Sequence, residues 1–194
     1  MICYLCRHGQ DDNTVRGGWS QHPLTAEGKA EAKELAFFLE KKECNIRHVY
    51  SSDLLRSVQT AQAVAARLDL PIIYMPEFRE VNNGILAGMK NELANQQYPG
   101  LYWNSLAWEQ PYPNGESPRS FFERICTAWN RFQEEIIQKN ENVLLVTHGG
   151  VIQVILSLVN GVAYSNQAHH RKIANTELIA LKYDNGAWKE VSYH

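Results

Sequence analysis

Short apolar runs that lead straight into polar residues recur along this chain of 194 residues. Residues 2–6, 46–50 and 143–147 are three such runs, and their length and bulky side chains predict buried strands. A fourth strand is predicted over residues 71–75. The polar residues that follow the first three runs therefore lie where strands end.

Apolar residues spaced three and four apart predict helices between the strands. Thr25 can cap a helix with the buried stripe Ala32, Leu35, Ala36 and Leu39. Ser52 or Asp53 can cap a second helix, with the stripe Leu54, Val58, Ala61, Ala65 and Leu68. Ser117 followed by proline predicts the start of a third, with one face formed by Phe121, Ile125, Ala128 and Phe132.

The last third of the chain predicts a short buried helix over 151–159 and a terminal β-hairpin. The hairpin pairs residues 178–183 with 188–193 around Asn185-Gly186. Alternating strands and helices predict an α/β fold, in which a mainly parallel sheet lies between helical layers. We find no repeat or interdomain linker, so residues 1–194 are expected to form a single domain.

The segment of about residues 81–116 has no clear periodicity and is rich in aromatic residues and proline. Its rings belong to Tyr98, Tyr102, Trp103, Trp108 and Tyr112. An insertion of this length is either a lid or a packed surface excursion anchored by its rings.

Composition is that of an ordinary enzyme, with 44% hydrophobic residues, a formal net charge of -2 and a pI near 6.4. No apolar stretch is long enough to span a membrane, and the net charge does not indicate binding to nucleic acid or to an anionic membrane. The first residues lack the pattern of a signal peptide, so we expect a cytoplasmic protein. The sequence does not predict an oligomeric state.

Four cysteines raise the question of a metal site, since Cys3 and Cys6 have the spacing C-x-x-C. Within a strand, residues three apart point to opposite faces, so these thiols cannot share a metal ion. We expect core thiols, and Cys44 and Cys126 have no partner motif, which fits a reducing compartment. No metal site or cofactor is predicted.

Cationic residues gather where the predicted strands end. Arg7 and His8 follow the first strand, Arg56 lies in the turn after the second, and His148 follows the strand at 143–147. Ligands of open α/β sheets bind outside the carboxyl ends of the strands, so these four side chains can converge. Such a cluster is costly unless an anion occupies it, and arginine matches phosphate oxygens in a bidentate way.

At these residues the chain resembles the histidine phosphatase superfamily, also called the phosphoglycerate mutase-like group (branch 1). The resemblance covers nearly the whole chain, in the family's order and spacing. It rests on Arg7-His8-Gly9-Gln10, the stretch from Arg16 to Leu24-Thr25-Ala26-Glu27-Gly28, Ser51 to Ala61, Arg79-Glu80 with Gly84 and Gly88, Pro113-Asn114-Gly115-Glu116-Ser117, and Val146-Thr147-His148-Gly149-Gly150.

The resemblance implies a three-layer α/β/α fold with a lid at about 81–116, and it assigns roles to individual residues. His8 becomes the nucleophile that forms a phosphohistidine, and Glu80 becomes the proton donor for the leaving group. Arg7, Arg56 and His148 hold the phosphate, helped by backbone amides near Gly149. Asn13 matches, less closely, an asparagine that contacts phosphate in the family.

Three functions remain open at this stage. The segment from Val81 to Ser117 holds only Lys90 as a cation, which favours a metal-independent phosphatase for small-molecule phosphate monoesters with a bulky, aromatic or uncharged leaving group. The resemblance includes α-ribazole phosphatase and broad-specificity phosphatases. The alternatives are mutase-type phosphoryl transfer between phosphoglycerates and a non-catalytic protein that binds phosphorylated ligands.

Overall fold

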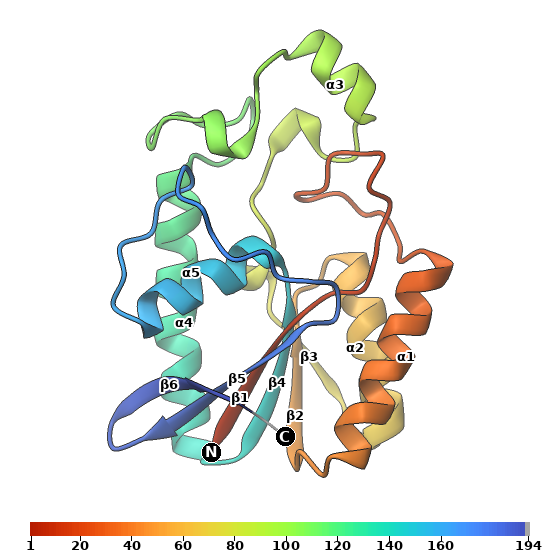
Figure 1. Cartoon of the computed structure of the whole chain (residues 1–194), viewed down its shortest axis with the longest axis vertical. Coiled ribbons are helices and arrows are strands. Elements are labelled where there is room, and N and C mark those ends of the chain that lie inside the picture. Colours follow the sequence, from red (N-terminus) through yellow and green to blue (C-terminus); the bar gives the residue numbers. More distant parts are fainter. Residues whose placement is uncertain (193–194) are drawn as a thin grey trace.

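A computed structural model describes residues 1–192 and shows a six-stranded sheet covered by helices on both faces (Figure 1). The strands are β1 (Ile2–Arg7), β2 (Ile46–Ser51), β3 (Ile72–Tyr74), β4 (Asn142–Thr147), β5 (Leu178–Asp184) and β6 (Ala187–Val191). The helices are α1 (Ala26–Lys41), α2 (Leu55–Leu68), α3 (Asn91–Gln97), α4 (Pro118–Lys139) and α5 (Gly149–Val159). The predicted three-layer α/β fold is confirmed.

Strand order is β3-β2-β4-β1-β5-β6, with β1 to β4 parallel and the β5–β6 hairpin antiparallel. The hairpin turns at Asn185 and Gly186, which both have positive φ as the predicted two-residue turn requires. Strand β6 ends at Val191, and the part of the predicted strand at Tyr193 lies outside the described residues.

Each face of the sheet has its own core because side chains alternate along the strands. Cys3 packs with residues of α4 and α5 on one face, whereas Cys6 packs with residues of α1 and α2 on the other. Both thiols are fully buried and free. This confirms that the C-x-x-C spacing within a strand separates the two cysteines.

Two of the three predicted helix caps are confirmed. The Thr25 hydroxyl accepts a hydrogen bond from the Gly28 amide at 3.0 Å at the start of α1. Ser117 and Ser120 form a capping box at the start of α4, with Pro118 as its first residue. The predicted buried stripes of both helices lie in the core.

The predicted cap of α2 is wrong. The helix begins at Leu55, and its N-cap residue is Leu54, which makes no side-chain capping bond. Ser52 turns towards His148 and Asp53 pairs with Arg79, so tertiary contacts take both candidate caps. The buried face also differs from the predicted stripe, since it includes Arg56, Ser57, Thr60 and Val64, while Val58 and Leu68 are half-buried.

The insertion lies beyond the carboxyl ends of the parallel strands, where Figure 1 shows α3 at the top of the molecule. It has a small core of its own, made of Leu86, Ala94, Leu106 and Tyr112. Trp103 stacks on Tyr112 and meets Phe121 of α4 edge to face, with ring centroids 6.3 and 5.4 Å away. The rings thus anchor the excursion to the main core, and its opening as a lid stays a prediction.

No helix in the described part of the chain is long and apolar enough to cross a membrane.

Phe132 gives a direct test of the core between α4 and the sheet. Its ring is 1% exposed and meets Tyr50 and Phe78 edge to face at 4.9 and 5.4 Å. Phe132→Ala should lower the free energy of unfolding by about 3–5 kcal/mol, because it leaves a cavity. Phe37→Ala, at a ring that is 51% exposed, is the control for chemical denaturation. Equal losses in both variants would contradict this description of the core.

Candidate active site

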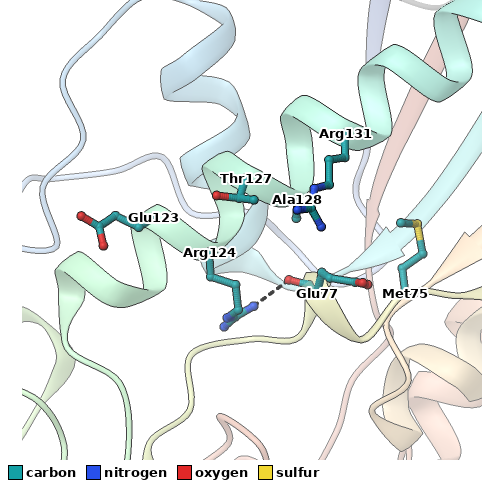
Figure 2. A pocket seen from close by; sticks show the side chains of 7 residues that line it. All are labelled: Met75, Glu77, Glu123, Arg124, Thr127, Ala128 and Arg131. Atoms are coloured by element: carbon teal, nitrogen blue, oxygen red, sulfur yellow. Dashed lines mark hydrogen bonds between the residues drawn. The ribbon is translucent and has the colours of Figure 1, made fainter.

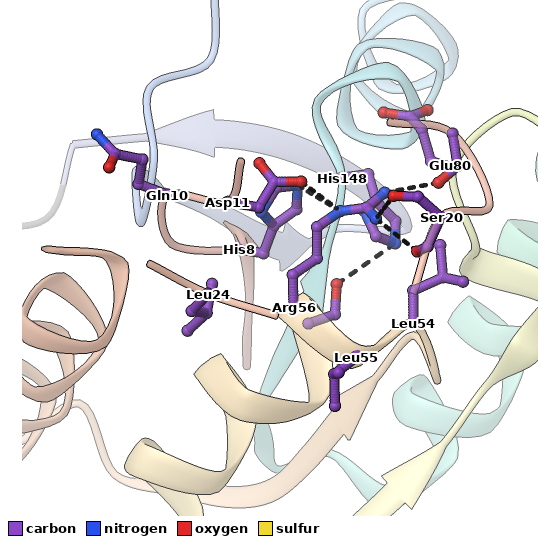
Figure 3. Close-up of polar contacts among 12 residues, drawn as sticks. His8, Gln10, Asp11, Ser20, Leu24, Leu54, Leu55, Arg56, Glu80 and His148 are labelled. Atoms are coloured by element: carbon purple, nitrogen blue, oxygen red, sulfur yellow. Dashed lines mark hydrogen bonds and ion pairs between the residues drawn. The ribbon is translucent and has the colours of Figure 1, made fainter. Parts of the chain in front are cut away.

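Three neighbouring strands deliver the predicted cationic residues to one place. His8 follows β1 and His148 follows β4, while Arg56 lies in the first turn of α2, directly after β2. The imidazole centroids of the two histidines are 5.1 Å apart, and Arg56 Nε lies 3.1 Å from His8 Nε2 (Figure 3). All three side chains are buried, with 4% exposure at His8 and 2% or less at the others.

The His8 imidazole is held as a neutral base. Its Nδ1 donates to the Gly9 carbonyl at 2.7 Å, which leaves a lone pair on Nε2, and Arg56 Nε donates to that atom. Burial lowers the pKa of His8 well below its ordinary value, and the charges of Arg56 and Arg7 add to this shift. Nε2 is therefore an unprotonated nitrogen surrounded by cations, as a nucleophile towards an anion requires.

His148 is fully buried beside His8 and is held by two serines. Its Nε2 lies 2.9 Å from Ser52 Oγ and 3.3 Å from Ser57 Oγ. Its Nδ1 is buried and has no hydrogen-bond partner among the described residues. Burial is also the main cause that lowers the pKa of His148, and the charges of Arg56, Arg7 and Arg124 lower it further. In the tautomer whose Nε2 accepts from a serine hydroxyl, Nδ1–H is a free donor for an anionic oxygen.

Two arginines supply fixed positive charge. Arg7 donates from NH1 to the Ile173 carbonyl at 2.6 Å, and its Nε is buried without a partner in the described chain. Arg56 is tied to the loop before α1, where it donates to the Ser20 carbonyl at 3.1 Å and the Gly18 carbonyl at 2.7 Å. These bonds fix both guanidinium groups before any ligand arrives.

The Glu80 carboxylate also belongs to this site, and an amide in the first turn of α5 helps to hold it. The Val81 and Gly150 amides each donate to it at 3.1 Å. A Cβ atom at position 150 would lie 2.5 Å from Glu80 Oε1, so only glycine permits this approach. Helix α5 begins at Gly149 rather than at the predicted 151, and its first turn therefore belongs to the site. Gly149 lies next to Arg7, since a Cβ there would be 3.9 Å from the Arg7 side chain.

Asn13 lies apart from this cluster. It is exposed, and its backbone carbonyl accepts a hydrogen bond from the Asn91 side chain at 2.8 Å. The structure thus brings together Arg7, His8, Arg56, Glu80, His148 and Gly149, and phosphate contact by Asn13 stays a prediction.

Several polar residues at the site escaped sequence reasoning. Asp11 lies 3.5 Å from Arg56 Nε and adds a negative charge next to the cations. Thr60 accepts from the Gly9 amide at 3.0 Å and fixes the loop after β1. Ser57 and Thr60 interrupt the buried face of α2, and hydroxyl groups at core positions of a helix were the available signal.

Acid should destabilise the protein through its two buried histidines. Free histidine titrates near pH 6.5, whereas the pKa values of folded His8 and His148 lie well below it. Below about pH 6.5 the unfolded chain therefore binds more protons, and the free energy of unfolding falls by up to about 1.4 kcal/mol per pH unit for each histidine. The fall ends once the pH passes the folded pKa values.

Denaturant unfolding from about pH 8 to about pH 5 in phosphate-free buffer measures this slope. His8→Gln should remove roughly half of it. His169→Gln, on an exposed loop, controls for the loss of a histidine as such. A slope that His8→Gln leaves unchanged would argue against a buried neutral imidazole.

Known proteins match the chain over its whole length. Residues 3–194 match the family described as histidine phosphatase superfamily (branch 1). A Proteus mirabilis protein named probable phosphoglycerate mutase GpmB is 32% identical over 193 residues, which are 95% of this chain and 86% of that protein. Two solved structures share the fold.

The α-ribazole phosphatase from Shigella flexneri has a TM-score of 0.83 and 23% identity, covering 100% of this chain and 96% of its own. The mycobacterial glucosyl-3-phosphoglycerate phosphatase has a TM-score of 0.80 and 22% identity, covering 99% and 97%. Their names describe phosphatases and the relative's name a mutase, so phosphoryl chemistry is common to all three. On its sequence and its fold, the chain belongs to the histidine phosphatase superfamily, branch 1.

Proposed function

We propose that this protein is a metal-independent phosphatase, which hydrolyses small-molecule phosphate monoesters through a phosphohistidine on His8. The observation that carries the proposal is the state of this imidazole. Nδ1 donates to the Gly9 carbonyl, and the unprotonated Nε2, which accepts from Arg56 Nε, lies among three cationic or donor side chains. Phosphohistidine chemistry is also general in the superfamily.

The first step transfers the phosphoryl group to His8. Nε2 attacks phosphorus, the N–P bond forms and the bond from phosphorus to the ester oxygen breaks. Arg7, Arg56 and His148 Nδ1–H hold the three equatorial oxygens, whose charge they stabilise in the transition state. The first turn of α5 adds the positive end of a helix dipole. The proposal needs no metal ion because these groups supply the positive charge.

Glu80 completes both half-reactions. It gives its proton to the departing alkoxide, which leaves as an alcohol. Its carboxylate then takes a proton from water, the water oxygen attacks phosphorus, and the N–P bond breaks to release inorganic phosphate. The Val81 and Gly150 amides that hold this carboxylate fix its direction in both steps.

The surroundings favour an uncharged or aromatic leaving group. Lys90 is the one cation of residues 81–116, and it is exposed. The insertion beyond the carboxyl ends of the strands also carries aromatic rings, among them Tyr112, which stacks on Trp103. A mutase for phosphoglycerates needs cations for a second anionic group, and the name of the Proteus mirabilis relative keeps this as the second candidate.

A panel of esters tests the proposal, with phosphate release measured in the presence of chelator. Aryl phosphates and bulky alkyl phosphates should be hydrolysed, and His8→Ala should abolish release because no nitrogen is left to attack. Interconversion of phosphoglycerates, followed in parallel, would establish the mutase instead. Binding of phosphate esters without turnover of any of them would contradict the proposal and support a non-catalytic protein that binds phosphorylated ligands.

Loss of the proposed acid should depend on the leaving group. Glu80→Gln keeps the size of the side chain but cannot cycle a proton, so kcat/KM for alkyl phosphates should fall roughly 10²- to 10⁴-fold. For a nitrophenyl phosphate, whose phenolate leaves without a proton, kcat/KM should change little. Equal losses of kcat/KM for both esters would remove Glu80 from the role of proton donor.

A further inference from the structure

The segment that carries Glu80 has no regular structure of its own. Residues 79–83 lie between the short 3₁₀ helices Pro76–Phe78 and Gly84–Leu86. A backbone of this kind has no helix or sheet to satisfy its polar groups or to fix its position. Something else must hold Glu80 at the site.

One side chain of α4 binds three backbone carbonyls of this region. Arg124 NH1 donates to the Glu77 carbonyl at 2.7 Å and to the Arg79 carbonyl at 3.0 Å, and NH2 donates to the Glu80 carbonyl at 3.1 Å. Figure 2 shows the Arg124 side chain reaching from α4 towards Glu77 at the wall of a cavity of about 340 Å³. The cavity is not lined by any residue of the catalytic cluster, so Arg124 reaches the Glu80 segment from outside that cluster.

Glu116 accepts the remaining hydrogen bonds of the Arg124 guanidinium. Its Oε1 accepts from Arg124 Nε at 2.7 Å and its Oε2 from NH2 at 2.8 Å, which is a bidentate pair. Oε2 also accepts from the Asn82 amide at 2.8 Å. The two side chains are 21% and 16% exposed, so water screens them only in part.

All five donors of the Arg124 guanidinium are therefore used, three on carbonyls before or at Glu80 and two on Glu116. Arg124 contacts Glu80 only at the Glu80 backbone carbonyl, and the positive charge of Arg124 is paired with Glu116. The Glu80 carboxyl group thus stays free to exchange a proton. Trp19 Nε1 donates to the same carbonyl at 2.7 Å.

We propose that Arg124 is a positioning residue for the proton donor Glu80. Its guanidinium, which is paired with Glu116, holds the backbone at Glu80 so that the carboxyl group faces the reaction centre. This inference rests on the proposed function, since it assumes that Glu80 protonates a leaving group. Lysine cannot replace arginine here, because a point charge with three donors cannot satisfy five acceptors in one plane.

The test compares two esters in Arg124→Lys. A displaced acid should lower kcat/KM for an alkyl phosphate by on the order of 10²-fold, while a nitrophenyl phosphate changes far less, because only the alkyl ester needs a proton. The ratio kcat/KM covers the steps up to transfer to His8, so slow hydrolysis of the phosphohistidine does not mask the effect.

Arg119→Lys is the matched control. Arg119 lies on the same helix and also forms ion pairs, with Glu109 and Glu123, but it is 51% exposed and does not contact the segment 79–83. It should leave both esters unaffected. If Arg124→Lys does not fold, Glu116→Gln serves instead, since it removes the charged partner and keeps the carbonyl contacts.

A double variant separates positioning from general structure. In the Glu80→Gln background, Arg124→Lys should cost little more for the alkyl ester, because the group that it positions is already lost. Equal losses for the two esters, or losses that multiply in the double variant, would overturn the inference. A wild-type protein that hydrolyses neither ester would instead overturn the proposed function itself.

Discussion

The parallel pairing of β2, β4 and β1 sets the geometry of the site. The register places Arg7 beside Thr147 and Ser51 beside Val146, so the three strands end at one level. The parallel hydrogen-bond pattern continues into the loops after β1 and β2. The His8 amide donates to the Thr147 carbonyl and the Ser52 amide to the Val146 carbonyl, both at 3.0 Å. A shift of one residue in either pair would point His8 or His148 to the opposite face.

This convergence has an energetic cost that the rest of the fold must offset. Two imidazoles and a guanidinium are almost fully removed from water, and both histidines are kept neutral where a free histidine begins to protonate. The unpartnered Arg7 Nε and His148 Nδ1 are left without the hydrogen bonds that buried groups normally have. A bound phosphate would supply oxygens for both atoms and negative charge for the arginines. The site is thus organised for its ligand at the expense of stability, as functional sites commonly are.

Strand positions, helix faces and the convergence of His8, Arg56 and His148 could all be predicted, because apolar periodicity and the rule for strand ends depend on local sequence. The cap of α2 could not, since Ser52 and Asp53 satisfy local rules but bind His148 and Arg79 in the fold. The start of α5 was missed for a related reason. Glycine disfavours helices, yet Gly149 and Gly150 open this one, and at position 150 the approach of Glu80 leaves no room for a side chain. Arg124 has no local signal for this role, since the backbone carbonyls that it binds around Glu80 lie 44 to 47 residues away in sequence.

The hydrogen bond from Arg56 to His8 Nε2 has a consequence for turnover. In the resting protein the guanidinium occupies the lone pair that must attack phosphorus, so an incoming phosphate has to take Arg56 Nε for itself before the nucleophile is exposed. In the proposed hydrolysis the same competition would act in reverse, because Arg56 can bind His8 again as inorganic phosphate departs. In the proposed reaction this resting contact would offset part of the binding free energy of substrate and product alike, and so would help the site to empty between cycles.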